Sequence, residues 1–183
     1  VLTGNWSNDL LLLMKASHNA GLKVHFGTTS LDQPGNIGNA GDAAEGSYVA
    51  QTYNTAAAEP ATLEFSQAYK TATGNFPVYV EPQTIFAMEM LGSALSATTP
   101  VNNALLVKNL AENLEKASIQ SPLGTITVRK DDHQAVFPMV VSVVSRDAKY
   151  KVDGTDLGFK PVRIFTAEEA AVPAQATCKM QRP

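Results

Sequence analysis

The first 27 residues, VLTGNWSNDLLLLMKASHNAGLKVHFG, decide the fold class of this chain. Val1-Leu2-Thr3 is the end of an apolar strand, and Ser7-Asn8-Asp9 are residue types that cap helices by accepting bonds from unpaired backbone N–H groups. The expected helix continues through the apolar residues 10–14 and stops at Gly21, which tolerates left-handed backbone. A second short strand follows at residues 24–27. The stretch therefore predicts a compact parallel βαβ crossover.

The rest of the chain first continues this alternation and then turns to strands. Residues 30–46 are rich in Gly and Pro and predict a long loop, a kind of loop that often binds something. Helices are expected over residues 39–44, 62–73, 83–97 and 102–117. Strands are expected over residues 47–53, 125–128, 137–145 and 149–152. The helix at 83–97 should be buried, because it is apolar on more than one face, and an extended tail is expected from Thr166. The pattern predicts an α/β chain.

Composition excludes several classes of function. With 183 residues, 44% of them hydrophobic and 17% charged, the chain can bury a sizeable core. The net charge of -3 comes from scattered residues, and no Lys/Arg cluster is longer than Arg129-Lys130, so nucleic acid is not an expected partner. The longest apolar run, residues 10–14, is far shorter than the roughly 20 residues of a membrane helix. No membrane-spanning segment is expected.

The two ends of the chain carry their own expectations. The N-terminus shows neither an initiator Met nor a basic segment leading into an apolar one, so we expect a cut end. The single cysteine, Cys178, has no intrachain partner. In an exported protein an odd cysteine indicates a partner on another segment, here a missing one. A free thiol on a mobile tail is the alternative.

Several short motifs, taken together, resemble one known family. They are Gly4-Asn5-Trp6-Ser7 at the strand-to-helix turn, Ala20-Gly21-Leu22-Lys23, and Asn39-Ala40-Gly41-Asp42-Ala43-Ala44-Glu45-Gly46. Phe76-Pro77 and the run from Asp132-His133-Gln134 to Pro138 continue the same order. In spacing they resemble the C-terminal half of the leucine/isoleucine/valine-binding protein family, the type I periplasmic solute-binding proteins of ABC transporters. The resemblance extends over essentially the whole chain.

The resemblance implies a fold and a division into domains. It implies an α/β chain of the periplasmic-binding-protein type I, with parts of two Rossmann-like lobes that close on a ligand like a Venus flytrap. Residues 1–50 would belong to the second lobe and residues 51–143 to the first, while residues 144–183 return to the second lobe and form the tail. The central strands of both sheets would be absent, which leaves backbone groups unpaired. We therefore expect a fragment that an N-terminal half completes.

The resemblance also implies where the ligand binds. An aromatic residue at the strand-to-helix turn packs on the ligand in the amino-acid binders of the family, and the matching residue is Trp6. An aromatic ring beside a helix N-terminus suits a planar or apolar ligand, although a Trp that fills the core is the alternative. Asn5 and Ser7, with Asn8, are expected to hydrogen-bond the same ligand. Helix capping explains Ser7 and Asn8 equally well.

One position departs from the family pattern. The amino-acid binders carry an acidic residue after the second strand, which pairs with the ligand's ammonium group, and the matching residue here is Ser30. A hydroxyl cannot offset a buried positive charge. Asp32 would substitute for it if the loop bends. Without that substitution, the expected ligand is an aromatic or keto carboxylate, or another small molecule, without an α-amino group, and Trp6 would suit an aromatic acid.

Catalytic and metal-binding patterns are not found in the sequence. His18, His25 and His133 lack metal-ligand spacing, and Asp131-Asp132-His133 is expected to be a solvated turn. No nucleophile elbow or phosphate-binding loop occurs. We expect no enzyme and no cofactor, but a periplasmic binding component that presents a small molecule to the membrane permease of an ABC transporter. A receptor's ligand-sensing domain or an intracellular amide-binding regulator is the alternative, and an enzyme whose catalytic groups lie elsewhere comes third.

Overall fold

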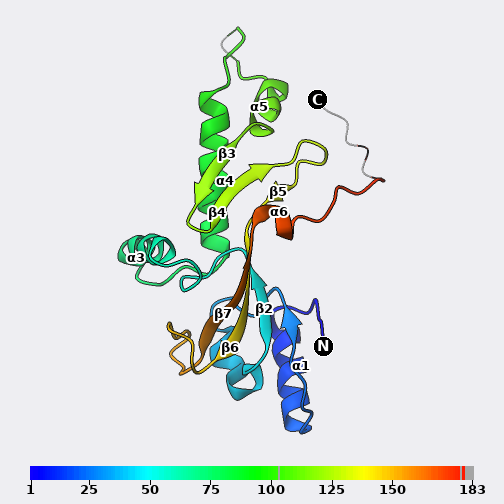
Figure 1. The fold of residues 1–183 in the computed structure, drawn as a ribbon, viewed down its shortest axis with the longest axis vertical. Coiled ribbons are helices and arrows are strands. Elements are labelled where there is room, and N and C mark those ends of the chain that lie inside the picture. Colours follow the sequence, from blue (N-terminus) through cyan, green and yellow to red (C-terminus); the bar gives the residue numbers. More distant parts are fainter. Residues whose placement is uncertain (103, 178, 180–183) are drawn as a thin grey trace. The chain divides into compact units, whose positions relative to one another are not determined.

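The computed structural model describes residues 1–102, 104–177 and 179. Cys178, for which a bond to a missing segment was one expectation, lies outside the described residues. The chain forms two compact units, the first made of Val1–Tyr79 with Met139–Ile164 and the second of Val80–Pro138 with the residues from Phe165 onward (Figure 1). It passes between the units three times. The lobe boundaries expected at 50/51 and 143/144 stay a prediction. The two units are defined by contacts within this chain, whereas the lobes were predicted for the full-length protein.

The first unit is built on a four-stranded mixed sheet. Its helices are α1 (Ser7–Asn19), α2 (Asn36–Ala40), the 3-10 helix η1 (Gly41–Ala44) and α3 (Ala61–Thr73). Its strands are β1 (Gly27–Thr28), β2 (Tyr48–Gln51), β6 (Met139–Ser145) and β7 (Gly158–Phe165), whose last residue falls in the second unit. They lie in the order β1-β2-β6-β7. Leu2 bridges Gly27 in parallel, and β1 pairs with β2 in parallel. These pairings confirm the predicted parallel crossover.

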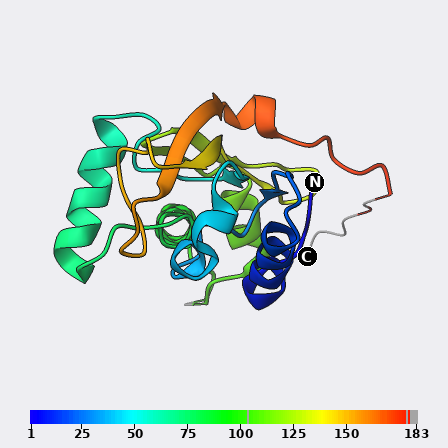
Figure 2. The same cartoon turned by 90° about the horizontal axis from the view of Figure 1, so that it is seen from below.

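One face of this sheet carries the core of the first unit. The apolar residues of α1 recur at helical spacing, and Leu10 and Met14 are fully buried. They pack with α2, η1 and the sheet, and Figure 2 shows α1 beside α2 and η1. The other core members are Leu11, Phe26, Leu31, Ile37, Ala40, Ala44, Val49, Val144 and Leu157. This packing fixes α1, and with it the turn from which α1 starts.

The second unit combines two helices with a small antiparallel sheet. Its elements are α4 (Val80–Ser96), α5 (Val107–Leu114), β3 (Ser118–Ser121), β4 (Gly124–Val128), β5 (Ala135–Val136) and α6 (Ala167–Ala170). The sheet order is β3-β4-β5, and α4 packs against α5 and β3. Phe86, Met90 and Ile126 are buried in this unit. Among the described residues, no helix is both long and apolar enough to cross a membrane.

The structure differs from the sequence-based expectations in several places. The strand predicted at residues 149–152 is wrong, because Lys149 and Tyr150 lie in a loop and both bond Glu59. The expected extended tail instead starts with α6, which a capping box formed by Thr166 and Glu169 stabilises. The helix at 83–97 is only partly buried, since Met88 is 62% exposed. The helix expected from residue 102 begins only at Val107.

Candidate ligand-binding site

A hollow of about 470 Å³ lies over the sheet of the first unit. It is lined by residues 2–4, 27–29 and 48–50 and by Val141. Two of these segments continue into the predicted site, since Asn5 and Trp6 follow Gly4 while Ser30 follows Thr29. The Thr3 N–H donates to the Gly27 carbonyl over 2.9 Å, so the two segments belong to neighbouring parallel strands. The structure therefore brings both predicted turns to the carboxyl ends of neighbouring parallel strands, on the same side of the sheet.

Trp6 occupies the N-cap position of α1. Its backbone is extended, with φ -142° and ψ 164°, and its side chain makes no cap hydrogen bond. The side chain is 64% exposed, so within the described residues it does not fill the core. The indole is therefore exposed at the beginning of α1.

Asn5 and Ser7 precede and follow Trp6 in the sequence. Asn5 belongs to a tight turn in which the Thr3 hydroxyl donates to Asn5 Oδ1 and the Asn5 N–H donates to Thr3 Oγ1 over 3.1 Å. Ser7 is exposed and has a left-handed backbone with φ 51°, which is uncommon outside glycine. The N-cap residue of α1 is Trp6, so Ser7 does not act as the N-cap.

Ser30 and Asp32 occupy different surroundings within the β1–α2 loop (residues 29–35). Ser30 is half-buried; its N–H donates to Thr28 Oγ1 over 3.1 Å and its carbonyl accepts from Asn36 Nδ2 over 2.8 Å. Asp32 is only 2% exposed and accepts a 2.7 Å bond from Gln51 Nε2 on β2. The carboxylate of Asp32 therefore ties this loop to the sheet from the inside.

Sequence reasoning missed some residues that shape this region. Tyr48 is 44% exposed and lines the hollow, whereas the sequence pattern predicts only that it belongs to a strand. Asp153 accepts bonds from the backbone N–H groups of Gly35, Ile37 and Gly38, at the beginning of α2. This contact could not be predicted from a local sequence pattern, because 115 residues separate Asp153 from Gly38.

The acidic turn at residues 131–133 belongs to the second unit. The Arg129 guanidinium donates to both carboxylate oxygens of Asp132, over 2.8 and 2.5 Å, and this bond holds the pKa of Asp132 below its usual range. His133 Nε2 lies 2.8 Å from Glu115 Oε1. No cluster of three or more His, Cys, Asp or Glu residues suited to a metal ion occurs in the described part of the chain.

Comparisons with known proteins identify the family. A family model described as periplasmic binding protein matches residues 1–149. The Leu/Ile/Val-binding protein homolog 4 of Brucella abortus (strain 2308) is 49% identical over 183 residues, which are 100% of this chain and 44% of that protein. The chain thus spans less than half the length of this relative.

Solved structures agree with the sequence match. The crystal structure of the leucine-, isoleucine-, valine-, threonine-, and alanine-binding protein from Brucella ovis, in its closed conformation, has a TM-score of 0.94 and 49% identity; the match covers 100% of this chain and 47% of that one. A solute binding protein from R. palustris in complex with benzoate has a TM-score of 0.70 at 19% identity, covering 98% and 46%, and this likeness shows the fold alone. The predicted resemblance and the type I fold are confirmed. This chain belongs to the periplasmic binding protein family, and its 49% identical relatives are named for binding leucine, isoleucine and valine.

Proposed function

We propose that the full-length protein is the periplasmic solute-binding component of an ABC transporter. It holds a small organic molecule in a cleft between its lobes and presents that molecule to a membrane permease, without catalysis and without a cofactor. The observation that carries the proposal is Trp6, a 64% exposed indole at the N-cap of a helix and beside a parallel strand end. Aromatic rings beside helix N-termini suit small ligands that have one apolar and one polar end.

The proposed ligand contacts come from two neighbouring turns. Trp6 packs on the ligand, while Asn5 and Ser7 offer polar groups on either side of it. Ser30 approaches from the β1–α2 loop, which leaves the adjacent strand. Asp32 belongs to the same loop and contributes by fastening it to the sheet, since its carboxylate accepts a bond from Gln51.

The proposed ligand is an aromatic or keto carboxylate that lacks an α-amino group. Ser30 carries no charge, so the ammonium group of an amino acid would lack a partner at that position. An amino acid remains the second candidate, because the Brucella ovis relative, 49% identical to this chain, is named for leucine, isoleucine, valine, threonine and alanine.

Calorimetry on the full-length protein tests both statements. L-leucine, benzoate and phenylpyruvate are titrated into wild type and into Trp6→Ala. We expect an aromatic or keto acid to bind wild type, and Trp6→Ala to bind at least tenfold more weakly, because a buried aromatic contact contributes about 2 kcal/mol. Tight leucine binding without binding of the acids rejects the ligand assignment. Binding unchanged in Trp6→Ala rejects the site.

The N-terminal half of the same protein is the proposed partner of the open face of the sheet in the first unit. Tyr48 pairs with Val143 and Ala50 with Val141, so these four side chains share one face, opposite the core face that holds Val49. Within the described residues, Tyr48 is 44% exposed on this face. The part of this mixed sheet formed by Leu2, β1 and β2 is parallel, and proteins cover parallel strands on both faces, so we expect a further layer here.

The edge of the same sheet supports this partner. Gly27 donates to the Val1 carbonyl over 2.7 Å and accepts from the Thr3 N–H over 2.9 Å. The N–H and C=O of Leu2 form no backbone bond to the described residues, and its side chain is 91% exposed. This edge is thus available to a strand of the N-terminal half. The isolated chain should bind the dye ANS, and co-expression with the N-terminal half should abolish that binding; a chain that folds alone without binding ANS contradicts the proposal.

A ligand-sensing receptor domain or an amide-binding regulator with this fold is the alternative function. A membrane anchor or an effector domain encoded in the full gene would favour it over a transport component.

A further inference from the structure

The β6–β7 connection (residues 146–157) is fastened to the α2–η1 segment by two side chains. Asp153 contacts the beginning of α2, and Arg146 contacts η1. Both contacts join parts of the chain that lie more than 100 residues apart. The α2–η1 segment follows directly after the β1–α2 loop. Contacts from the β6–β7 connection to this segment can therefore fix the conformation of the loop that carries Ser30.

Asp153 provides the cap that α2 lacks. The N-cap residue of α2 is Gly35, which has no side chain to accept a bond from the free N–H groups of the first turn. Asp153 Oδ1 accepts from the Gly35 N–H over 2.8 Å. Its Oδ2 accepts from the N–H groups of Ile37 and Gly38 over 2.9 and 3.1 Å. A single carboxylate thus satisfies three backbone donors, and such charge-assisted bonds are stronger than neutral ones.

The capped turn in turn holds the β1–α2 loop. Asn36 lies between Gly35 and Ile37, two of the residues that Asp153 binds. Its Nδ2 donates to the Ser30 carbonyl over 2.8 Å, and its N–H donates to the Gln33 carbonyl over 3.1 Å. Asn36 is 6% exposed, so its side chain has little freedom to move once the turn is fixed. A continuous path of contacts therefore joins Asp153 to the backbone of Ser30.

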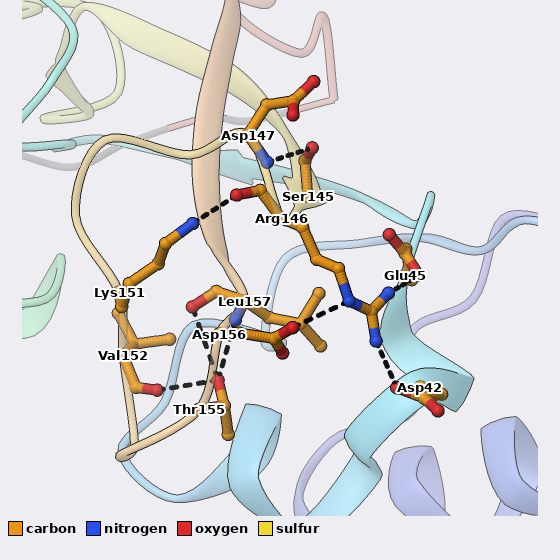
Figure 3. Close-up of polar contacts among 10 residues, drawn as sticks. All are labelled: Asp42, Glu45, Ser145, Arg146, Asp147, Lys151, Val152, Thr155, Asp156 and Leu157. Atoms are coloured by element: carbon orange, nitrogen blue, oxygen red, sulfur yellow. Dashed lines mark hydrogen bonds and ion pairs between the residues drawn. The ribbon is translucent and has the colours of Figure 1, made fainter.

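Arg146 makes the second attachment, shown in Figure 3. Its guanidinium binds Asp42 Oδ1 over 2.6 Å, Asp156 Oδ2 over 2.8 Å and also Glu45. The bonds from Glu45, Asp42 and Asp156 raise the pKa of Arg146. Asp42 lies in η1, Glu45 follows η1 and Asp156 lies in the β6–β7 connection, and the hydrogen bonds that join them to Arg146 do not involve the β1–α2 loop. Arg146 therefore fastens the connection without reaching the ligand site.

We propose that Asp153 is a positioning residue for ligand binding: by capping α2 it holds the β1–α2 loop, and through Asn36 the backbone of Ser30, in the conformation that receives the ligand. This rests on the proposed function. A loop without its cap must be ordered when the ligand binds, and the entropy of that ordering lowers the affinity.

The test is Asp153→Asn in the full-length protein. Asp153 has φ 52°, a left-handed conformation that Asn tolerates, so the turn is kept. The amide replaces an acceptor oxygen by an NH2 group that faces a backbone N–H, so at least one of the three bonds is lost. The matched control is Asp156→Asn, the same change three residues later, where the carboxylate binds Arg146. Gly38→Ala is a second variant, because its added Cβ would lie 3.2 Å from the Asp153 Cβ and displace the contact from the helix side.

Two measurements decide the outcome: hydrogen exchange at residues 29–38, and calorimetry with L-leucine, benzoate and phenylpyruvate. We expect faster exchange at residues 29–38 in Asp153→Asn and Gly38→Ala, and affinity about three- to tenfold weaker for whichever probe binds wild type, as for the loss of a helix cap. Asp156→Asn should leave both unchanged.

The outcomes separate this inference from the function on which it rests. If wild type binds none of the three probes while exchange accelerates, Asp153 still positions the loop and the proposed function fails. If Asp153→Asn exchanges and binds as Asp156→Asn does, the inference is overturned. Faster exchange with unchanged affinity also overturns it, because the loop would then be held by Asp153 without serving the ligand.

Discussion

The hydroxyl of Tyr53 donates a 2.6 Å hydrogen bond to the backbone carbonyl of Thr62 at the beginning of α3. The same oxygen lies 2.8 Å from Ser66 Oγ, which is also 2.8 Å from Thr55 Oγ1. Tyr53 is 1% exposed, and Thr62 and Ser66 are fully buried. This network joins the segment after β2 to α3 in the interior of the first unit, where an unpaired polar group is costly.

Tyr53→Phe should lower the free energy of unfolding by about 1–2 kcal/mol, because the Ser66 hydroxyl loses a partner in a buried site. Tyr69→Phe is the matched control, since it removes a tyrosine hydroxyl from α3, the helix that Tyr53 contacts, and leaves the network intact. Chemical denaturation of the full-length variants at pH 7 measures both changes. An equal stability of the two variants contradicts the role assigned to the network.

Alkaline pH should weaken the wild type more than Tyr53→Phe. Burial raises the pKa of Tyr53 to about 12 from its ordinary value of 10.0, with the Ser66 bond acting in the opposite direction. Because the pKa is raised in the folded state, the unfolded chain loses the Tyr53 proton at lower pH than the folded chain does. The contribution of Tyr53 to the free energy of unfolding is therefore complete below pH 10 and decreases between pH 10 and 12. The decrease is at most about 2–3 kcal/mol. Denaturation at pH 9 and pH 11 should show the gap between wild type and Tyr53→Phe narrowing; a constant gap speaks against a shifted Tyr53.

Local signals in the sequence were sufficient for much of the first unit. The helix predicted over residues 62–73 is confirmed, and it ends before Gly74, whose φ of 88° is a backbone that glycine adopts without strain. The predicted start of α1 at Ser7 is confirmed as well. In both cases the information lies within a few residues of the element's end.

Long-range contacts explain what the sequence did not reveal. β7 was missed because its run GFKPVRIF contains Pro161 and charged residues, a composition that strands tolerate at a sheet edge, and β7 is the last strand of its sheet. The cap of α2 by Asp153 and the bond of Asp32 to Gln51 link segments that only the folded chain brings together. The turn that holds Trp6 was predictable because Gly4 and the polar residues 7–9 are close together in the sequence, although Trp6 and not Ser7 occupies the N-cap position.

Gly158 lies too close to its neighbours for any side chain. An added Cβ would lie 2.0 Å from the Tyr150 carbonyl oxygen and 2.9 Å from the Ala148 Cβ. We expect Gly158→Ala to destabilise the full-length protein by about 1–3 kcal/mol, the usual cost of overpacking. In Gly92→Ala, within α4, the added Cβ meets no described atom within 4 Å, so the change should stabilise the helix by about 0.5–1 kcal/mol. Thermal unfolding of both variants measures these opposite signs, and shifts of the same sign refute the prediction.

Arg146→Gln should lower the melting temperature at low ionic strength. The variant leaves the carboxylates of Asp42, Glu45 and Asp156 without the cation that they share. The arginine side chain is 42% exposed, so salt should screen its contribution; the Debye length falls from about 10 Å at 0.1 M to about 3 Å at 1 M. Melting curves at 50 mM and 1 M NaCl should show the difference from wild type shrinking. A difference that persists in 1 M salt means that Arg146 acts through packing instead.

Ser30→Glu distinguishes the two proposed ligand classes directly. Ser30 is half-buried in the β1–α2 loop. It occupies the position at which the amino-acid binders of the family are expected to carry an acidic residue for the ligand's ammonium group. If the ligand is a carboxylate, the added charge repels it, and we expect benzoate or phenylpyruvate to bind at least tenfold more weakly. Ser30→Gln has the same length without the charge and controls for crowding of the loop.

The sign of the affinity difference between Ser30→Glu and Ser30→Gln distinguishes the two ligand classes. For a carboxylate ligand, Ser30→Glu must bind more weakly than Ser30→Gln, and lowering the pH toward the ordinary Glu pKa of about 4.3 should restore part of the affinity as the side chain becomes neutral. For an amino acid, the added carboxylate supplies the missing partner, so leucine should bind Ser30→Glu more tightly than Ser30→Gln. Because the two ligand classes predict opposite differences between the same two variants, one pair of calorimetric titrations assigns the class even if both variants bind more weakly than wild type.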